Sequence, residues 1–175
     1  NLESPSQLAN TQRPVFQLFR DQLELAGYRS RFVAGKSSGG QMLAIPRERN
    51  RSHAQQLILG HVDTVWPLGT LDTMPIESRN GCLHGPGSYD MKAGLVQAVF
   101  AVQTLQDIGL KPSVTPIFFL NSDEEIGSHD SVRQIERLAR VVDRTFVVEP
   151  SLGPSGKLKT QRKSPATTRF VRRSL

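Results

Sequence analysis

Six residues that can bind a metal or transfer a proton stand at the ends of apolar runs or just before a long apolar pattern. They are one histidine and five carboxylates: His61, Asp63, Asp90, Glu124, Glu125 and Glu149. Carboxylates that lie close together repel one another, and their removal from water is unfavourable unless a cation neutralises them. A divalent metal supplies that charge. A donor set of imidazole and carboxylates without thiolate suits zinc, with manganese or cobalt as alternatives.

Each residue has a role that its type and position allow. His61 offers an imidazole nitrogen, and Asp63, on the same side of an extended chain, can accept the other ring N–H and fix the tautomer. Asp90 sits in a turn, where its carboxylate can bridge two metal ions. Glu124 and Glu125 point apart on an extended backbone, so one can bind metal while the other accepts a proton from water. Glu149 adds a further carboxylate.

Each short motif also has an explanation without a metal. A histidine and an aspartate two positions apart usually lie in a loop or at the end of a strand and bind no metal. An acidic run is usually solvated or begins a helix. The metal site is favoured because four separate strand or loop ends each carry a ligand-type residue. The remaining histidines are His53, His84 and His129, and they lack this context. We expect them to be solvent-exposed or to contact the metal ligands without binding the metal themselves.

Hydrophobic periodicity predicts the elements that must position these residues. The expected elements are, in chain order, helix 11–27, strands 28–34, 41–45 and 57–59, helix 92–108, strand 113–121, helix 130–142 and strand 145–148. This order is typical of an α/β domain with a largely parallel or mixed central sheet flanked by helices. Ligands of such sheets bind outside the carboxyl ends of the strands, so the six residues are expected to meet at one edge.

Three local features carry further expectations. Pro116 removes one backbone donor, so its strand is expected to lie at a sheet edge or to contain a bulge. Asp130 is positioned to cap the helix that follows it. Apolar residues, among them Val96 and Phe100, cover much of helix 92–108, so that helix is expected to be well buried.

The composition is that of an ordinary globular domain. The chain has 175 residues, of which 37% are hydrophobic and 22% charged, and no apolar run approaches the ~18 residues of a membrane-spanning helix. The single cysteine, Cys82, excludes an internal disulfide and gives no sign of an oxidising compartment. We therefore expect a cytoplasmic protein with no membrane partner, although a start at Asn1 leaves room for a periplasmic or secreted parent.

The net charge of +6 comes from one end of the chain. Seven of the 22 basic residues lie in 156–175, which contain no acidic residue, so residues 1–155 hold 15 basic residues against 16 acidic ones. Such a segment is either a functional tail that binds nucleic acid or another anion, or an abnormal chain end. Nucleic acid is the less favoured partner, because no helix-turn-helix, zinc-finger or ribonucleoprotein motif accompanies the basic residues.

Four sequence blocks together resemble a known enzyme family. The blocks are GHVDTVWPLGTL at 60–71, HGPGSYDMKAGL at 84–95, FFLNSDEEIGS at 118–128 and VVEPS at 147–151. They are similar to successive motifs of the zinc metallopeptidase family that contains glutamate carboxypeptidase, aminoacylase, acetylornithine deacetylase and succinyl-diaminopimelate desuccinylase. The similarity is strongest to the glutamate carboxypeptidase branch, and it covers most of residues 10–163.

The resemblance implies a two-metal hydrolase with a role for each residue. In the family pattern Asp90 bridges two zinc ions, His61 and Glu149 complete one site, and Glu125 binds the other ion. Glu124 is the general base that acts on metal-activated water, and Asp63 orients His61. The peptide bond between Asp90 and Met91 is expected to be cis. The implied substrate is a small peptide or N-acyl amino acid with a free carboxylate, whose amide bond is cleaved.

The last part of the sequence departs from the family. Family members have an inserted lid and dimerisation domain and a further metal-ligand histidine, and neither follows the family-like residues 1–163. The final segment, 164–175 (SPATTRFVRRSL), is basic and does not resemble the family, which indicates truncation or a shift of reading frame near Ser164. The expectation is a fragment with a weak second metal site, little activity alone and poor solubility.

Two other functions stay open beside the hydrolase. One is a homologue that binds metal without catalysis, which the missing histidine favours. The other is a binding module in which the basic segment contacts nucleic acid or an anionic surface and the rest of the chain is a scaffold.

Overall fold

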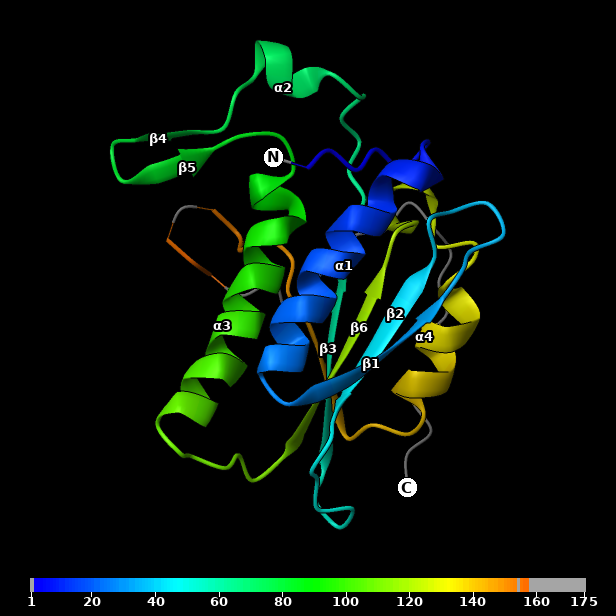
Figure 1. The fold of residues 1–175 in the computed structure, drawn as a ribbon, viewed down its shortest axis with the longest axis vertical. Helices are drawn as coiled ribbons and strands as arrows, with labels where there is room; N and C mark the ends of the chain where they lie inside the picture. The colour runs from blue at the N-terminus through cyan, green and yellow to red at the C-terminus, as the bar shows by residue number, and fades with distance from the viewer. Residues whose placement is uncertain (1, 154, 158–175) are drawn as a thin grey trace.

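A five-stranded sheet forms the centre of the computed structural model (Figure 1), which describes residues 2–153 and 155–157. The strand order is β1–β2–β6–β3–β7. The strands are β1 (Tyr28–Val33), β2 (Gln41–Pro46), β3 (Gln55–His61), β6 (Thr115–Asn121) and β7 (Arg144–Val147). The expected α/β fold with a mixed central sheet is confirmed. The predictions for residues 164–175 lie outside the described residues.

The three strands that precede the candidate residues are parallel to one another. β3 pairs with β6 along its whole length, so that His61 lies opposite Asn121, and it pairs with β7 on its other side. β2 is antiparallel to both β1 and β6. Because β3, β6 and β7 run in one direction, the residues that follow them emerge at the same edge of the sheet.

Helices cover both faces of this sheet (Figure 1). α1 (Ala9–Leu25) and α3 (Ala93–Asp107) lie on one face, and α4 (Val132–Ala139) lies on the other. Side chains of β6 therefore alternate between two cores. Phe118 packs with residues of α1 and α3, whereas Ile117 and Phe119 pack near Ile135 and Leu138 of α4. Burial on both faces explains why the central strands read as continuous apolar runs.

Short elements complete the chain near the carboxyl edge of the sheet. They are α2 (Thr70–Thr73), the hairpin of β4 (Glu77–Arg79) and β5 (Cys82–His84), the distorted turn η1 (Ser88–Lys92) and the single-turn helix η2 (Glu124–Ile126). The cis peptide expected between Asp90 and Met91 is present in η1. Within the described residues, no helix combines the length and apolar character that a membrane crossing requires.

Two expectations about burial and strand order are wrong. Pro116 lies in β6, which is the middle strand of the sheet and not an edge. It is tolerated as the second residue of the strand, where the pairing only begins. Helix α3 is also less buried than its composition predicts. Leu95 and Val99 face the core, but Val96 and Phe100 are 42% and 62% exposed, because no described element packs on that side.

Asp130 does not cap the helix that follows it. α4 begins at Val132, and the Asp130 carboxylate instead accepts backbone N–H bonds of 2.8–3.0 Å from Lys36, Ser37 and Ser38, in the turn between β1 and β2. The start of α4 uses Asp123, whose carboxylate accepts the backbone N–H groups of Asp130 and Ser131. Asp130 therefore fixes the loop after β6 to a turn more than 90 residues away in sequence.

Candidate metal centre

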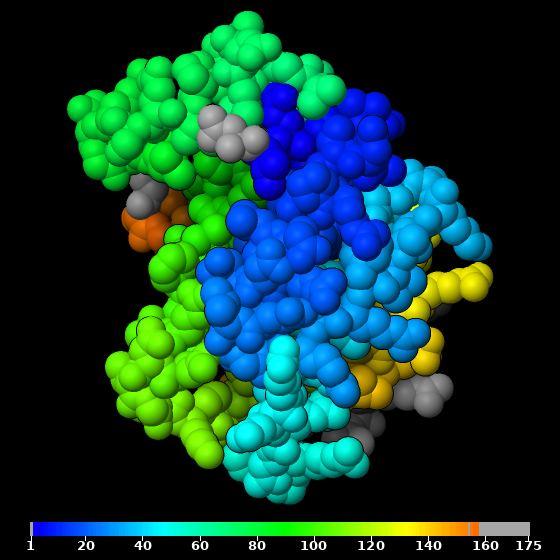
Figure 2. Space-filling view, in the orientation of Figure 1, coloured from blue at the N-terminus to red at the C-terminus, as the bar shows by residue number. Residues whose placement is uncertain are grey.

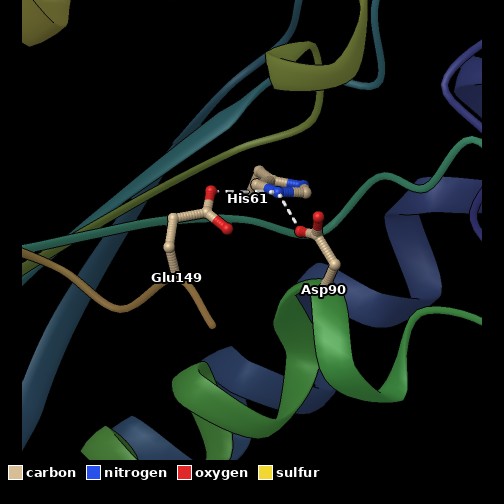
Figure 3. A group of neighbouring side chains, drawn as sticks. All are labelled: His61, Asp90 and Glu149. Carbon is tan, nitrogen blue, oxygen red and sulfur yellow. Dashed lines mark hydrogen bonds and ion pairs between the residues drawn. The ribbon is translucent and has the colours of Figure 1, made fainter. Parts of the chain in front are cut away.

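Four chain segments bring the candidate side chains to the carboxyl edge of the sheet. β3 ends at His61, η1 carries Asp90 in front of α3, η2 carries Glu124 after β6, and Glu149 follows β7. Donor atoms of His61, Asp90 and Glu149 lie within 4.8 Å of one another (Figure 3). The predicted meeting of residues from separate strand ends is therefore what the fold produces.

His61 stands at the centre of this group. Its side chain is 1% exposed, and its Nε2 atom lies 3.2 Å from Asp90 Oδ1, 3.5 Å from Glu149 Oε1 and 3.8 Å from Glu124 Oε2. The backbone N–H of His61 donates to the sulfur of Met91 at 3.1 Å. A buried imidazole on a central strand thus has one nitrogen directed at three carboxylates.

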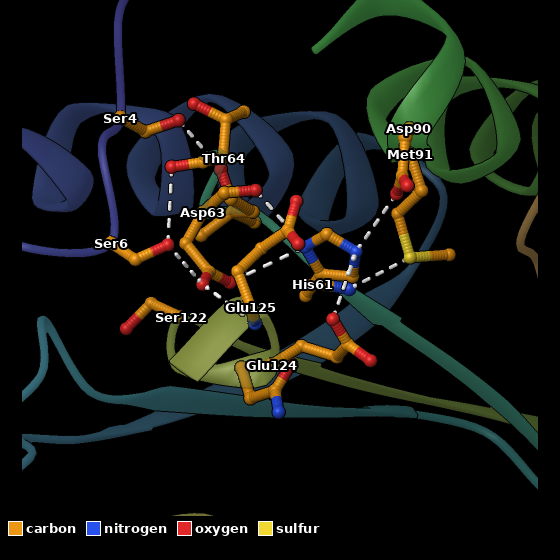
Figure 4. A network of polar contacts seen from close by, with 12 residues as sticks. Ser4, Ser6, His61, Asp63, Thr64, Asp90, Met91, Ser122, Glu124 and Glu125 are labelled. Atoms are coloured by element: carbon orange, nitrogen blue, oxygen red, sulfur yellow. Dashed lines mark hydrogen bonds and ion pairs between the residues drawn. The ribbon is translucent and has the colours of Figure 1, made fainter. Parts of the chain in front are cut away.

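The other ring nitrogen of His61 is held by Asp63, as Figure 4 shows. Nδ1 lies 3.0 Å from the backbone oxygen of Asp63 and 3.3 Å from its Oδ1. Asp63 is fully buried, and its Oδ2 accepts hydrogen bonds from the Ser6 hydroxyl at 2.7 Å and the Glu125 backbone N–H at 3.3 Å. A proton on Nδ1 is donated to the backbone oxygen of Asp63, beside its carboxylate, and leaves the Nε2 lone pair for a cation.

Burial and mutual repulsion shift the pKa values in this group. Burial opposes protonation of His61, but hydrogen bonds to Asp63 and Glu149 and the charge of Glu124 outweigh it and raise the pKa of His61 to about 11. Burial and the charge of Glu149 raise the pKa of Asp90, and burial raises the pKa of Glu124. The surroundings therefore stabilise positive charge beside Nε2, where a divalent cation can replace the proton.

Close packing sets the spacing between two of the three donors. A Cβ atom added at Gly94 in α3 would lie 1.9 Å from the carbonyl oxygen of Val148, the residue before Glu149. The Tyr89 hydroxyl, beside Asp90, donates to the backbone oxygen of Ser151 at 3.1 Å. These contacts hold the start of α3 against the segment that follows β7.

The structure does not bring every predicted residue into the group. The carboxylate of Glu125 lies outside the cluster of three, so its assignment as a ligand stays a prediction. His53, His84 and His129 are exposed. Met91 and Ser6 were missed by sequence reasoning. The position of Met91 next to Asp90 was a signal that could have identified it. No local sequence pattern links Ser6 to Asp63, which is 57 positions away.

Comparison with known proteins places the chain in a family. A profile described as peptidase family M20/M25/M40 matches residues 57–163, which is more than half of the chain. The chain belongs to this family. The matched M20/M25/M40 region contains all six candidate residues, and the resemblance inferred from the four sequence blocks is confirmed.

Curated relatives of this M20/M25/M40 chain include two kinds of enzyme. Carboxypeptidase G2 of Pseudomonas sp. (strain RS-16) is 29% identical over 110 residues, covering 63% of this chain and 26% of that protein. Succinyl-diaminopimelate desuccinylase of Polaromonas sp. is 34% identical over 101 residues, covering 53% of this chain and 24% of that protein. The chain thus spans about a quarter of the length of these relatives.

Solved structures show the same fold. Human carnosine dipeptidase 1 superposes with a TM-score of 0.72 at 20% identity, covering 86% of this chain and 36% of that one. The M20 family metallo-carboxypeptidase Sso-CP2 from Sulfolobus solfataricus gives a TM-score of 0.65 at 21% identity, with 84% and 33% coverage.

Proposed function

We propose that this chain binds a divalent metal, zinc in the first place, through His61, Asp90 and Glu149, and contributes it to hydrolysis of an amide bond. The single observation that carries the proposal is the convergence of these three donors within 4.8 Å of one another. Imidazole nitrogen and carboxylate oxygen are both zinc ligands, and catalytic zinc sites have three protein ligands. Membership of a peptidase family supports the reaction class.

The electrostatics of the site support a cation as well. The Nε2 atom of His61 faces the carboxylates of Asp90, Glu124 and Glu149. Hydrogen bonds to Asp63 and Glu149 and the charge of Glu124 raise the pKa of His61, which supports positive charge at this position. The Asp90 side chain is 55% exposed, so the proposal includes a second ion bridged by Asp90 and bound by Glu125. The family pattern supports that second part.

The chain's own residues then have distinct tasks. A bound divalent metal lowers the pKa of a water molecule and polarises the substrate carbonyl. Glu124 is the proposed general base, because burial raises the pKa of its carboxyl and its Oε2 lies at the donor cluster without belonging to it. It accepts a proton from water as the oxygen adds to the carbonyl carbon, and returns it to the amine nitrogen when the C–N bond breaks. Asp63 keeps the proton of His61 on Nδ1.

The proposed substrates are small peptides or N-acyl amino acids. The names of the similar proteins, a carboxypeptidase, a desuccinylase and a dipeptidase, support this class. The same substrate class is proposed for the whole protein.

Zinc titration of the metal-free chain by calorimetry tests the metal site. His61→Ala is expected to weaken zinc binding by more than about 100-fold, because loss of a partner outside the ligand shell already costs 10–100-fold. His84→Ala is the matched control, since His84 is exposed in β5 and lies apart from the cluster. Equal binding by both variants would remove the basis of the proposal.

Catalysis is tested separately with Glu124→Gln. This variant is expected to bind zinc with nearly unchanged affinity and to lose N-acyl-glutamate hydrolysis by about 100-fold or more, the scale of general base catalysis. Hydrolysis that survives the substitution would exclude Glu124 as the base. Zinc binding with no hydrolysis in either form would keep the metal site and contradict the proposal that this chain by itself catalyses hydrolysis.

A further inference from the structure

A second cavity lies at the other end of the sheet from His61. Its volume is about 700 Å³, within the range of small-molecule sites. It is lined by the loop between β2 and β3, by the last turns of α3 and by the segment that leads into β6. Figure 2 shows the β2–β3 loop, in cyan, at the lower end of the molecule beside the end of α3, in green. The proposed hydrolysis does not use this region.

Apolar side chains line the interior of this cavity. Val102, Leu105 and Val114 line it together with Tyr28, which is 4% exposed. The Tyr28 ring packs edge-on against Phe118, with ring centres 5.4 Å apart. Burial raises the pKa of the Tyr28 phenol, so its hydroxyl keeps the proton and can donate a hydrogen bond.

The rim of the cavity is basic. Arg49, His53 and Lys111 line it, and Glu48 is the acidic residue among the lining. Within the part of the chain that the structure describes, the Arg49 and Lys111 side chains form no ion pair, since the ion pairs there involve Arg20 and His61. Arg49, Lys111 and Glu48 together carry one net positive charge, which matches a monoanion better than a dianion such as phosphate.

We propose that this cavity binds a small apolar carboxylate. The hydrocarbon part lies against Val102 and Leu105, the carboxylate meets Arg49 and Lys111 at the rim, and the Tyr28 hydroxyl donates a hydrogen bond to it. Arginine and lysine both recognise carboxylates, and a charge-assisted hydrogen bond is stronger than a neutral one. The site is independent of the metal, because it lies at the opposite ends of β3 and β6 from the carboxylate cluster.

Octanoate is the probe, and the test is titration of the ¹⁵N-labelled 175-residue chain followed by amide NMR signals. Saturable shifts are expected at the lining residues of the β2–β3 loop and of the segment that leads into β6. Acetate, which has the charge alone, and 1-octanol, which has the chain alone, are each expected to bind about tenfold more weakly. Shifts centred on the exposed apolar side of α3, around Val96 and Phe100, would overturn the proposal.

Two variants and one matched control test the named contacts. Arg49→Ala is expected to weaken octanoate binding by about tenfold, the scale of one charge-assisted hydrogen bond. Arg51→Ala, in the same loop but not in the lining, is the control and is expected to bind within about twofold of the original chain. Tyr28→Phe removes only the hydroxyl and is expected to weaken binding by about fivefold.

Three results would overturn the assignment. The first is an equal loss of octanoate affinity in Arg49→Ala and Arg51→Ala. The second is unchanged octanoate affinity in Tyr28→Phe, with an amide spectrum that shows this variant folded. The third is 1-octanol binding as tight as octanoate binding. Repeating the titration with His61→Ala keeps this inference separate from the metal site. That variant is expected to retain octanoate binding in full, whatever its effect on zinc.

Discussion

Gly94→Ala is the substitution that best tests how packing builds the metal centre. Two effects of this change oppose each other. Alanine is the better helix former, so an isolated helix would gain about 1 kcal/mol. Against this gain, the new Cβ atom would lie 1.9 Å from the carbonyl oxygen of Val148, far inside the 3.4 Å at which ordinary contact begins.

The clash is expected to win. Either α3 or the segment after β7 must move by roughly 1.5 Å, and the overpacking of a close contact costs about 1–3 kcal/mol. The free energy of unfolding is therefore expected to fall by up to about 2 kcal/mol once the helix preference is subtracted. Because α3 follows Asp90 and Val148 precedes Glu149, the same movement separates two donors. Metal sites need their ligands held to within about 0.5 Å, so zinc affinity is expected to drop by about 10–100-fold.

Urea unfolding and zinc calorimetry on the same protein samples measure both effects. Ala101→Gly is the control, because Ala101 is an exposed residue of the same helix. It is expected to cost about 1 kcal/mol of stability and to leave zinc affinity unchanged. If Gly94→Ala instead raises stability and binds zinc normally, helix preference outweighs the contact, and the packing of α3 on Val148 does not set the donor spacing.

Three other experiments, with four substitutions, test separate parts of the structure. Burial opposes ionisation of Asp130, but hydrogen bonds from Ser37, Ser38 and Lys36 hold its pKa below the usual value. The ionised carboxylate therefore stabilises the fold at a pH above the unfolded pKa of ~3.9. This stabilisation is lost as the pH falls through the lower folded pKa. Asp130→Asn is therefore expected to be less stable than the original chain by a constant amount near neutral pH, with the difference shrinking in acid, as urea titrations between pH 7 and pH 2 will measure. Exchanging the exposed Phe100 and Phe146 for lysine is expected to reduce aggregation in light scattering without loss of stability. Phe118→Ala is expected to cost about 3–5 kcal/mol in urea unfolding, because Phe118 is fully buried.

The sequence was informative where a residue pattern and its structural cause are local. Residues 57–59 and 113–121 were predicted as buried strands because strands covered on both faces have few polar side chains. β3 contains the first range, and β6 begins two residues later than predicted and contains 115–121. The meeting of His61, Asp90 and Glu149 followed from a general property of parallel sheets rather than from any one motif. The prediction of the candidate site therefore depended on the prediction of the fold.

The wrong expectations concern contacts that no local pattern records. Asp130 had the type and place of a helix cap, but three backbone N–H groups near residue 37 compete for its carboxylate and are distant in sequence. Helix α3 is apolar on most sides, which usually indicates full burial, yet Phe100 is exposed because burial depends on which elements arrive to cover it. Local sequence cannot show those partners.

The donors of the candidate metal centre differ in how firmly the protein holds them. His61 is fixed on a central strand, with its backbone N–H on Met91 and one ring nitrogen beside the buried Asp63. The carboxylate of Asp90 comes from η1 and is 55% exposed, and that of Glu149 follows β7 and is 28% exposed. A rigid imidazole therefore defines where positive charge is stabilised, while the carboxylates retain freedom to adjust around an ion. Metal selectivity should accordingly depend more on the contacts that place Asp90 and Glu149, such as Gly94 against Val148, than on His61.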